Sequence, residues 1–124
     1  KALDNAKHAV KKGGIIILTA ACSEGLGEST FEKWMTQAKE PDELIRRIRA
    51  DFKLGGHKAA AIAMVMQSAD VYLVSDLPPE LVKSIFFRPF GSAQQALDQA
   101  FCELGHDSKV LLMPCGGSTL PLLK

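Results

Sequence analysis

The chain has 124 residues, of which 47% are hydrophobic and 23% charged, and its formal net charge is +1. This composition is typical of one globular domain that buries about two thirds of its unfolded surface, and it excludes a disordered chain. No large basic face for nucleic acid stands out, and the longest apolar runs are too short to span a membrane. Three cysteines without a CxxC pair predict free thiols and a cytoplasmic location rather than a disulfide framework.

Helical patterns and an apolar strand alternate along the first half of the chain. Residues 2–12 carry a helical apolar stripe, and residues 15–18 form the unbroken apolar run typical of a strand covered on both faces. One further helix is expected to begin with a capping box at Ser29. Another is expected to have Pro41 as its first residue. The segment 57–68 is apolar nearly all round, which predicts a buried helix whose alanines allow close packing.

The alternation continues through the second half. Residues 71–74 have the pattern of a second strand, and residues 86–90 that of a third, at an edge because Pro89 cannot donate to a neighbour. A capped helix is expected from Ser92, and residues 109–113 form the last apolar run. The sequence therefore predicts an α/β fold: a three-layer α/β/α domain with a mainly parallel, roughly four-stranded, Rossmann-like sheet in the order 3-2-1-4.

Two glycine-containing loops follow predicted strands, at residues 22–27 and 114–119. In open α/β sheets ligands bind at the carboxyl ends of the strands, so these loops are the candidate ligand edge. Backbone N–H groups ahead of a helix can hold an anion, but a plain strand-to-helix turn explains the first loop equally well. Neither loop has a dinucleotide fingerprint or a P-loop, since Leu120 stands where the lysine of a P-loop would be.

The cysteines and histidines indicate a functional site less clearly than the two loops do. Cys22 and Cys115 would face each other if the first and last strands were neighbours. They could then form a metal site or a redox pair, but free buried thiols are the favoured interpretation. The histidines lack metal-ligand spacing, and His8 and His106 are expected at the surface. His57 follows a double glycine at a helix start, where it could donate to a ligand. From the residues alone, no reaction is identified.

An ordered set of short stretches is similar to one family. The stretches are Lys1-Ala2, Gly13-Gly14 with the strand after it, Cys22 to Gly27, Gly55 to Ala59, Tyr72 to Leu77, and Pro114 to Pro121. In this order and spacing they resemble the C-terminal domain of the nickel-pincer lactate racemases and of related 2-hydroxyacid racemases and epimerases. The resemblance covers essentially the whole chain.

The resemblance implies that residues 1–124 are one α/β domain from the C-terminal part of a longer, two-domain enzyme with its active site between the domains. Family members hold a nickel-pincer nucleotide on a lysine of the N-terminal domain. In these enzymes the cofactor takes the α-hydrogen of a 2-hydroxy acid as hydride and returns it to either face of the transient 2-keto acid. The implied partners are that N-terminal domain and a small 2-hydroxy acid, with no metal, nucleic acid or membrane on this chain. The chain alone is expected to be inactive.

Two residues of this sequence match positions of the family's substrate-binding site. Lys1, by its distance from the double glycine at 13–14, matches a family lysine that contacts the substrate, so a catalytic and substrate-binding role is implied. His57 stands where lactate racemase has an aromatic residue, which points to another 2-hydroxy acid. The loop residues expected to line the cleft are Ser23, Glu24, Gly25, Gly27, Gly116, Gly117 and Ser118.

A hypothesis from a different class remains open. The chain could be a non-catalytic α/β binding module whose glycine loops hold a nucleotide or a phosphorylated ligand. The enzyme is favoured if the parent gene encodes an upstream domain with the cofactor lysine and with the two histidines that serve the family as acid and base. A stand-alone reading frame favours the binding module.

Overall fold

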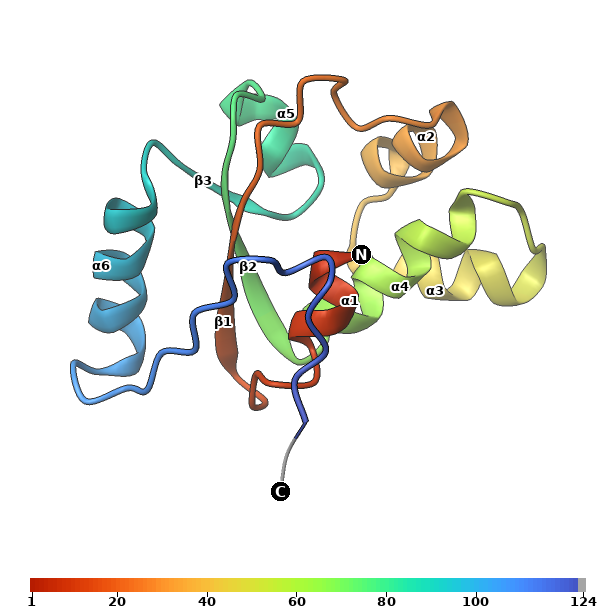
Figure 1. Cartoon of the computed structure of the whole chain (residues 1–124). Helices are drawn as coiled ribbons and strands as arrows, with labels where there is room; N and C mark the ends of the chain where they lie inside the picture. The colour runs from red at the N-terminus through yellow and green to blue at the C-terminus, as the bar shows by residue number, and fades with distance from the viewer. Residues whose placement is uncertain (123–124) are drawn as a thin grey trace.

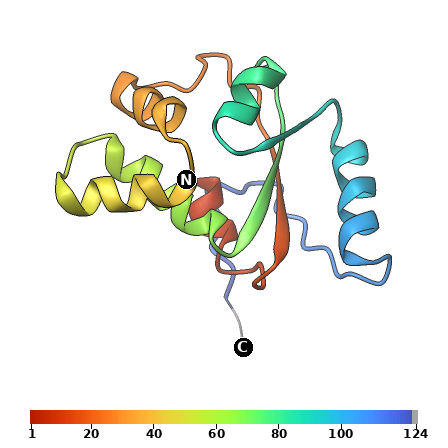
Figure 2. The ribbon, with the colours of Figure 1, turned by 180° about the vertical axis from the view of Figure 1, so that it is seen from behind.

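The computed structural model describes residues 1–122, in which three parallel strands form a sheet with helices on both faces (Figure 1). The elements in chain order are α1 (Ala2–Ala6), β1 (Gly14–Thr19), α2 (Ser29–Gln37), α3 (Pro41–Ala50), α4 (Gly56–Met66), β2 (Ala69–Val74), α5 (Pro79–Ser84), β3 (Arg88–Phe90) and α6 (Ala93–Leu104). Helix α6 lies on one side of the sheet and helices α1 to α4 on the other, as the view from behind also shows (Figure 2). No helix in this part of the chain has the length and hydropathy needed to cross a membrane.

Strand β2 lies at the centre of the sheet, parallel to both neighbours. Ile16 of β1 is paired with Val71, and Leu73 is paired with Pro89 of β3. The three strands thus have the predicted order, and the strand containing Pro89 is at an edge, where its missing N–H disturbs no ladder.

The fourth predicted strand is wrong. Residues 109–113 have no regular secondary structure, and the side chains of Val110, Leu111 and Leu112 are 58%, 63% and 81% exposed. An apolar run forms a strand only where a neighbouring edge and a covering layer are both available. The core between α6 and the sheet is made by residues of α6, β1, β2 and β3, and the exposed side chains of residues 110–112 take no part in it.

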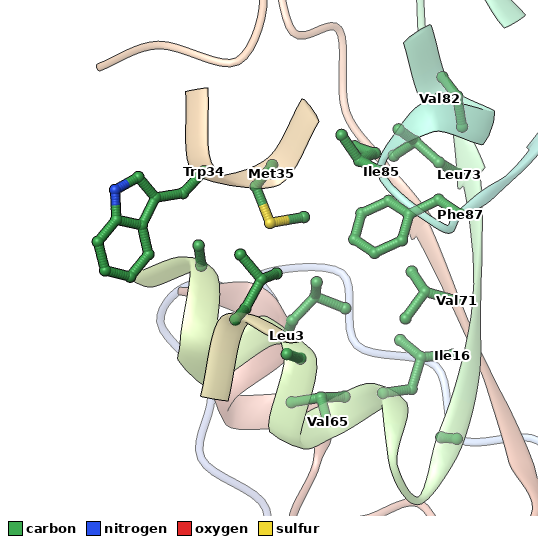
Figure 3. Close-up of a cluster of buried hydrophobic side chains, with 14 of the residues drawn as sticks. Leu3, Ile16, Trp34, Met35, Val65, Val71, Leu73, Val82, Ile85 and Phe87 are labelled. Atoms are coloured by element: carbon green, nitrogen blue, oxygen red, sulfur yellow. The ribbon is translucent and has the colours of Figure 1, made fainter. Parts of the chain in front are cut away.

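The larger core lies between the sheet and helices α1 to α5 (Figure 3). In the close-up, Ile16, Val71 and Leu73 point from the strands toward Met35 of α2 and Leu3 of α1. On α4 the side chains that face this core are small or β-branched, and Ala59 and Ala63 are fully buried. The predicted close packing of α4 is therefore confirmed.

The opposite face of α4 corrects one expectation. Although the helix is apolar nearly all round, Ala61 is exposed and the side chain of Met64 is 47% exposed. An apolar pattern does not specify how many neighbours a helix has, and α4 is covered by α1, α2, α3 and β2 on only part of its circumference.

A smaller core joins the other face of the sheet to α6. Ala96 and Ala100 of α6 pack on the fully buried Tyr72, with Ile15 and Ile17 of β1 against them. Successive residues of β1 thus point to opposite cores, which confirms that this apolar strand is covered on both faces.

Candidate functional site

The loop that follows β1 consists of two successive tight turns. The N–H of Gly25 donates to the carbonyl of Cys22 at 3.0 Å, and that of Gly27 donates to Glu24 at 3.3 Å. Gly25 and Gly27 have φ values of +66° and +86°, and no atom lies within 4 Å of where their Cβ atoms would be. Both glycines are therefore required by the backbone conformation and not by a close neighbour. Ser23 and Glu24 are exposed on this loop.

Glu28 ends the first loop and caps helix α2. Its carboxylate accepts hydrogen bonds from the N–H groups of Thr30 and Phe31, both at 2.9 Å. These bonds, that of Thr30 first, hold the pKa of the Glu28 carboxyl below its usual range. The expected cap was Ser29; the longer side chain of Glu28 takes this place because it reaches both N–H groups. The donors that would bind an anion at this helix start are thus used by the protein's own carboxylate.

Glu28 also lies against the start of helix α4, which explains the double glycine. Gly55 has a φ of +90°, and a Cβ there would clash with the Glu28 carboxylate. A Cβ on Gly56 would lie 2.7 Å from the ring of Trp34. Both glycines are needed for α4 to approach α2 this closely, and the approach brings the end of the first loop next to His57.

His57 is half-buried and held at three points by the segment before it. Its Nδ1 accepts a hydrogen bond from the N–H of Gly55 at 3.0 Å, and its own N–H donates to the carbonyl of Lys53 at 3.2 Å. Its ring lies against that of Phe52, with 5.8 Å between the centroids. Because Nδ1 accepts, the proton of the neutral imidazole is on Nε2, which is left to donate to a ligand.

Lys1 lies beside the second glycine loop. It is exposed and precedes α1, and its carbonyl accepts a hydrogen bond from the N–H of Asn5 at 3.1 Å. The side-chain amide of Asn5 donates to the carbonyl of Gly116 at 2.8 Å, and a Cβ on Gly116 would lie 3.3 Å from that of Ala2. Figure 1 shows the segment after α6 running back to α1. The first turn of α1 and this loop therefore form one unit.

The second loop is itself a tight turn. The N–H of Ser118 donates to the carbonyl of Cys115 at 2.9 Å, and no atom lies near the Cβ position of Gly117. Cys115 is exposed and Cys22 half-buried, and both are free thiols, so the expectation of two buried thiols is wrong for Cys115. The reason is that the last strand, which was to carry Cys115 into the sheet, is not formed.

The described contacts connect the predicted residues in two places only. Ala2 and Asn5, next to Lys1, contact Gly116 of the second loop. Gly55, two residues before His57, lies against Glu28, directly after the first loop, whereas Gly25 and Gly27 bond only within that loop. No hydrogen bond within residues 1–122 joins these two places. Two surface hollows of ≈ 300 and ≈ 230 Å³ include none of these residues and lie at the amino ends of β1 and β2.

Comparison with known proteins decides the family. The family described as the lactate racemase C-terminal domain matches residues 1–120. The chain belongs to this family. The resemblance inferred from the ordered motifs is therefore confirmed.

Two relatives show how much of a lactate racemase the chain covers. A lactate racemase from Thermoanaerobacterium thermosaccharolyticum is 29% identical over 125 aligned positions, which are 97% of this chain and 29% of that protein. The solved structure of the lactate racemase apoprotein from the same organism matches with a TM-score of 0.90 at 28% identity, over 97% of this chain and 30% of that one. The chain spans less than a third of the length of either relative.

Sequence reasoning missed two residues that connect parts of the candidate site. Glu28 could have been found, because a negatively charged side chain at a helix start is stabilised by the helix dipole. Asn5 could not, because its partner Gly116 lies 111 positions away.

A third missed feature ties α6 to the sheet. The guanidinium of Arg88 donates to the hydroxyl of Tyr72 at 3.1 Å and pairs with Glu103 of α6. Burial first, and then the bond to Glu103, raise the pKa of the Tyr72 hydroxyl above its usual range. Through Arg88, Tyr72 of β2 is thus connected to Glu103 of α6.

The described residues do not provide a set of metal ligands. In residues 1–122, no three His, Cys, Asp or Glu side chains lie close enough together to hold a metal ion. The polar side chains that the candidate site presents are the imidazole of His57 and the exposed ammonium group of Lys1.

Proposed function

We propose that this chain is the C-terminal domain of a nickel-pincer-dependent 2-hydroxyacid racemase or epimerase and forms one wall of an active site between two domains. The observation that carries this function is the match to lactate racemases over nearly the whole chain. The contact of the helix after Lys1 with the second glycine loop supports it, because Lys1-Ala2 and that loop are two of the stretches through which the resemblance was found.

Lys1 is assigned to the carboxylate of the substrate. Every 2-hydroxy acid carries this group, and an ammonium beside it makes a charge-assisted hydrogen bond, about twice as strong as a neutral one. The side chain of Lys1 is exposed, whereas Lys7 on the same helix is paired with Asp4 at 2.7 Å. The contact between α1 and Gly116 fixes the backbone from which Lys1 extends.

His57 is assigned to an oxygen atom of the substrate. The bond from Gly55 leaves Nε2 as the donor, and the ring is only half-buried, so a ligand can reach it. A donor at this position distinguishes acids by the oxygen atoms that they present, which would make His57 a determinant of substrate selectivity.

The cofactor is assigned to another domain. Since the described residues offer no ligand set, this chain is given only the binding and orientation of the acid. The two hydrogen-bonding groups, at Lys1 and at His57, would then be joined by the domain that carries the nickel-pincer nucleotide. The expected cytoplasmic location is part of the same proposal.

The alternative of a phosphate-binding module is disfavoured. The α2 N–H groups that such a ligand would use are bonded to Glu28. A bound phosphate would have to displace this carboxylate and would meet its negative charge.

The test compares the full-length protein with the 124-residue chain. Each is incubated with nickel-pincer cofactor and a panel of enantiopure 2-hydroxy acids, and the opposite enantiomer or epimer is measured by chiral chromatography. We expect turnover of at least one acid by the full-length protein and none by the chain alone. Failure of the cofactor-loaded full-length protein on every acid would contradict the proposal.

The same samples test where the cofactor is held. After dialysis against a mild chelator, nickel is expected to remain in the full-length protein only. Stoichiometric nickel in the 124-residue chain would show that the assignment of the metal to another domain is wrong.

A further inference from the structure

Phe52 is an exposed aromatic residue directly beside the proposed substrate donor. It follows α3, and 67% of its surface is accessible. Its ring lies 5.8 Å from that of His57 at an interplanar angle of 31°. A large apolar side chain this exposed gains little free energy from burial, so its main contact in this segment is the one with the imidazole of His57.

The two hydrogen bonds of His57 leave its imidazole ring free to pivot, and the contact with Phe52 limits this pivot. The bond from the His57 N–H to the Lys53 carbonyl fixes the backbone of His57, and the bond from the Gly55 N–H fixes Nδ1. One hydrogen bond at Nδ1 still allows the imidazole plane to pivot about that atom. The ring of Phe52 against the imidazole limits this pivot and with it the direction in which Nε2–H points.

We propose that Phe52 is a positioning residue that holds the imidazole of His57 so that Nε2–H points at the substrate. This role rests on the proposed function, because it assumes that His57 donates to a 2-hydroxy acid. Phe52 acts through His57 and does not itself touch the substrate. Its effect on turnover is therefore an effect on the orientation of the donor.

Leu54 provides a matched control. It lies two residues from Phe52 in the same segment, and 79% of its surface is exposed. It has no ring to place against His57. A general loss of apolar surface in this segment would affect Phe52→Ala and Leu54→Ala alike, whereas a positioning role would affect only Phe52→Ala.

The first measurement is made on the imidazole itself. Histidine is labelled with ¹⁵N in the 124-residue chain, and the His57 ring signals are assigned by their absence in His57→Asn. We expect the wild type to show the Nε2–H tautomer. Phe52→Ala should shift the His57 ring signals while those of His8 and His106 stay in place, and Leu54→Ala should shift none. Unchanged His57 signals in Phe52→Ala would overturn the proposal.

The second measurement is kinetic and uses the cofactor-loaded full-length protein. Phe52→Ala is expected to lower kcat/KM by about tenfold, and Phe52→Tyr, which keeps the ring, should restore most of it. Leu54→Ala should match the wild type, and all variants should keep the wild-type Tm. Equal losses in Phe52→Ala and Leu54→Ala, or His57 signals that move without a kinetic change, would also overturn the proposal. If the wild type turns over no acid, the proposed function fails, and the ring signals alone decide whether Phe52 holds His57.

Discussion

The side-chain amide of Asn5 donates a 2.8 Å hydrogen bond to the backbone carbonyl of Gly116, 111 positions further along the chain. This bond joins the helix that begins after Lys1 to the glycine loop that follows the unpaired segment 109–113. It is the contact through which the last part of the chain becomes part of the candidate site.

Replacing Asn5 by Ala should loosen the second loop. The loss of one partly buried hydrogen bond is expected to lower the free energy of unfolding by about 1 kcal/mol. Amide exchange at residues 115–118 should become faster, while exchange in β1 stays the same, as hydrogen–deuterium exchange with mass spectrometry would show. Lys7→Ala on the same helix is the control and should leave the loop unchanged. Wild-type exchange of the loop in Asn5→Ala would mean that other contacts hold it.

Two substitutions of His57 separate its two nitrogen atoms. In His57→Asn the amide oxygen can still accept from Gly55, but the distal donor is lost; in His57→Gln an amide N–H lies near the former Nε2, but the bond to Gly55 is lost. If Nε2 contacts the substrate, the full-length His57→Gln protein should keep more activity than His57→Asn. If His57 only caps α4, the order reverses, and thermal melts of both variants would show which one is less stable.

The close packing of α4 predicts which substitutions the fold tolerates. Ala59→Leu and Ala63→Leu place extra atoms where no space exists and should each lower the free energy of unfolding by about 1–3 kcal/mol. Arg49→Ala, at an exposed position of α3, should change it by roughly half a kcal/mol or less. Urea denaturation measures both. Arg47 is not a suitable control, because its guanidinium lies 4.2 Å from the centre of the Trp34 ring. Equal effects in the two groups would contradict the packing described for α4.

The Glu103 carboxylate predicts a loss of stability in acid. The hydroxyl of Tyr72 and the guanidinium of Arg88 lower its pKa from 4.5 to about 2. A carboxyl with a lowered folded-state pKa stabilises the fold above its unfolded pKa, so this contribution should disappear as the pH falls from 4.5 toward 2. Since the group is a third exposed, we expect it to contribute at most about 1 kcal/mol. Glu103→Gln should show a shallower decline over this pH range in denaturation curves, and an identical decline would exclude the role of Glu103.

Most helices and strands could be predicted because their signals are local. The apolar run of β1, Pro41 at a helix start and Ser92 as a cap each concern neighbouring residues, and the structure agrees with all three. The run at 109–113 looked the same locally, but a strand also needs a paired neighbour and a covering layer, and this segment pairs with no strand of the sheet and exposes its side chains. Local pattern therefore could not distinguish this segment from a real strand.

The candidate site could be predicted only as a set of residues. The carboxyl-edge rule indicated the two glycine loops as the ligand edge, but it did not indicate that Glu28, directly after the first loop, lies against Gly55. The bond between Asn5 and Gly116 has no sequence signal, because nothing in a polar side chain specifies a carbonyl at such a separation. The contacts between these residues therefore could not be predicted from the sequence and are seen only in the folded chain.

The most direct test of the proposed function is the kinetic effect of Lys1→Ala in the full-length, cofactor-loaded protein. Lys11→Ala, an exposed lysine ten positions later, is the matched control for the loss of charge. If Lys1 binds the substrate carboxylate, Lys1→Ala should lower kcat/KM on the best 2-hydroxy acid by at least about tenfold, or roughly 1.4 kcal/mol of transition-state binding, while Lys11→Ala has wild-type kinetics. Wild-type kinetics in Lys1→Ala would contradict the assignment of this domain as a wall of the active site.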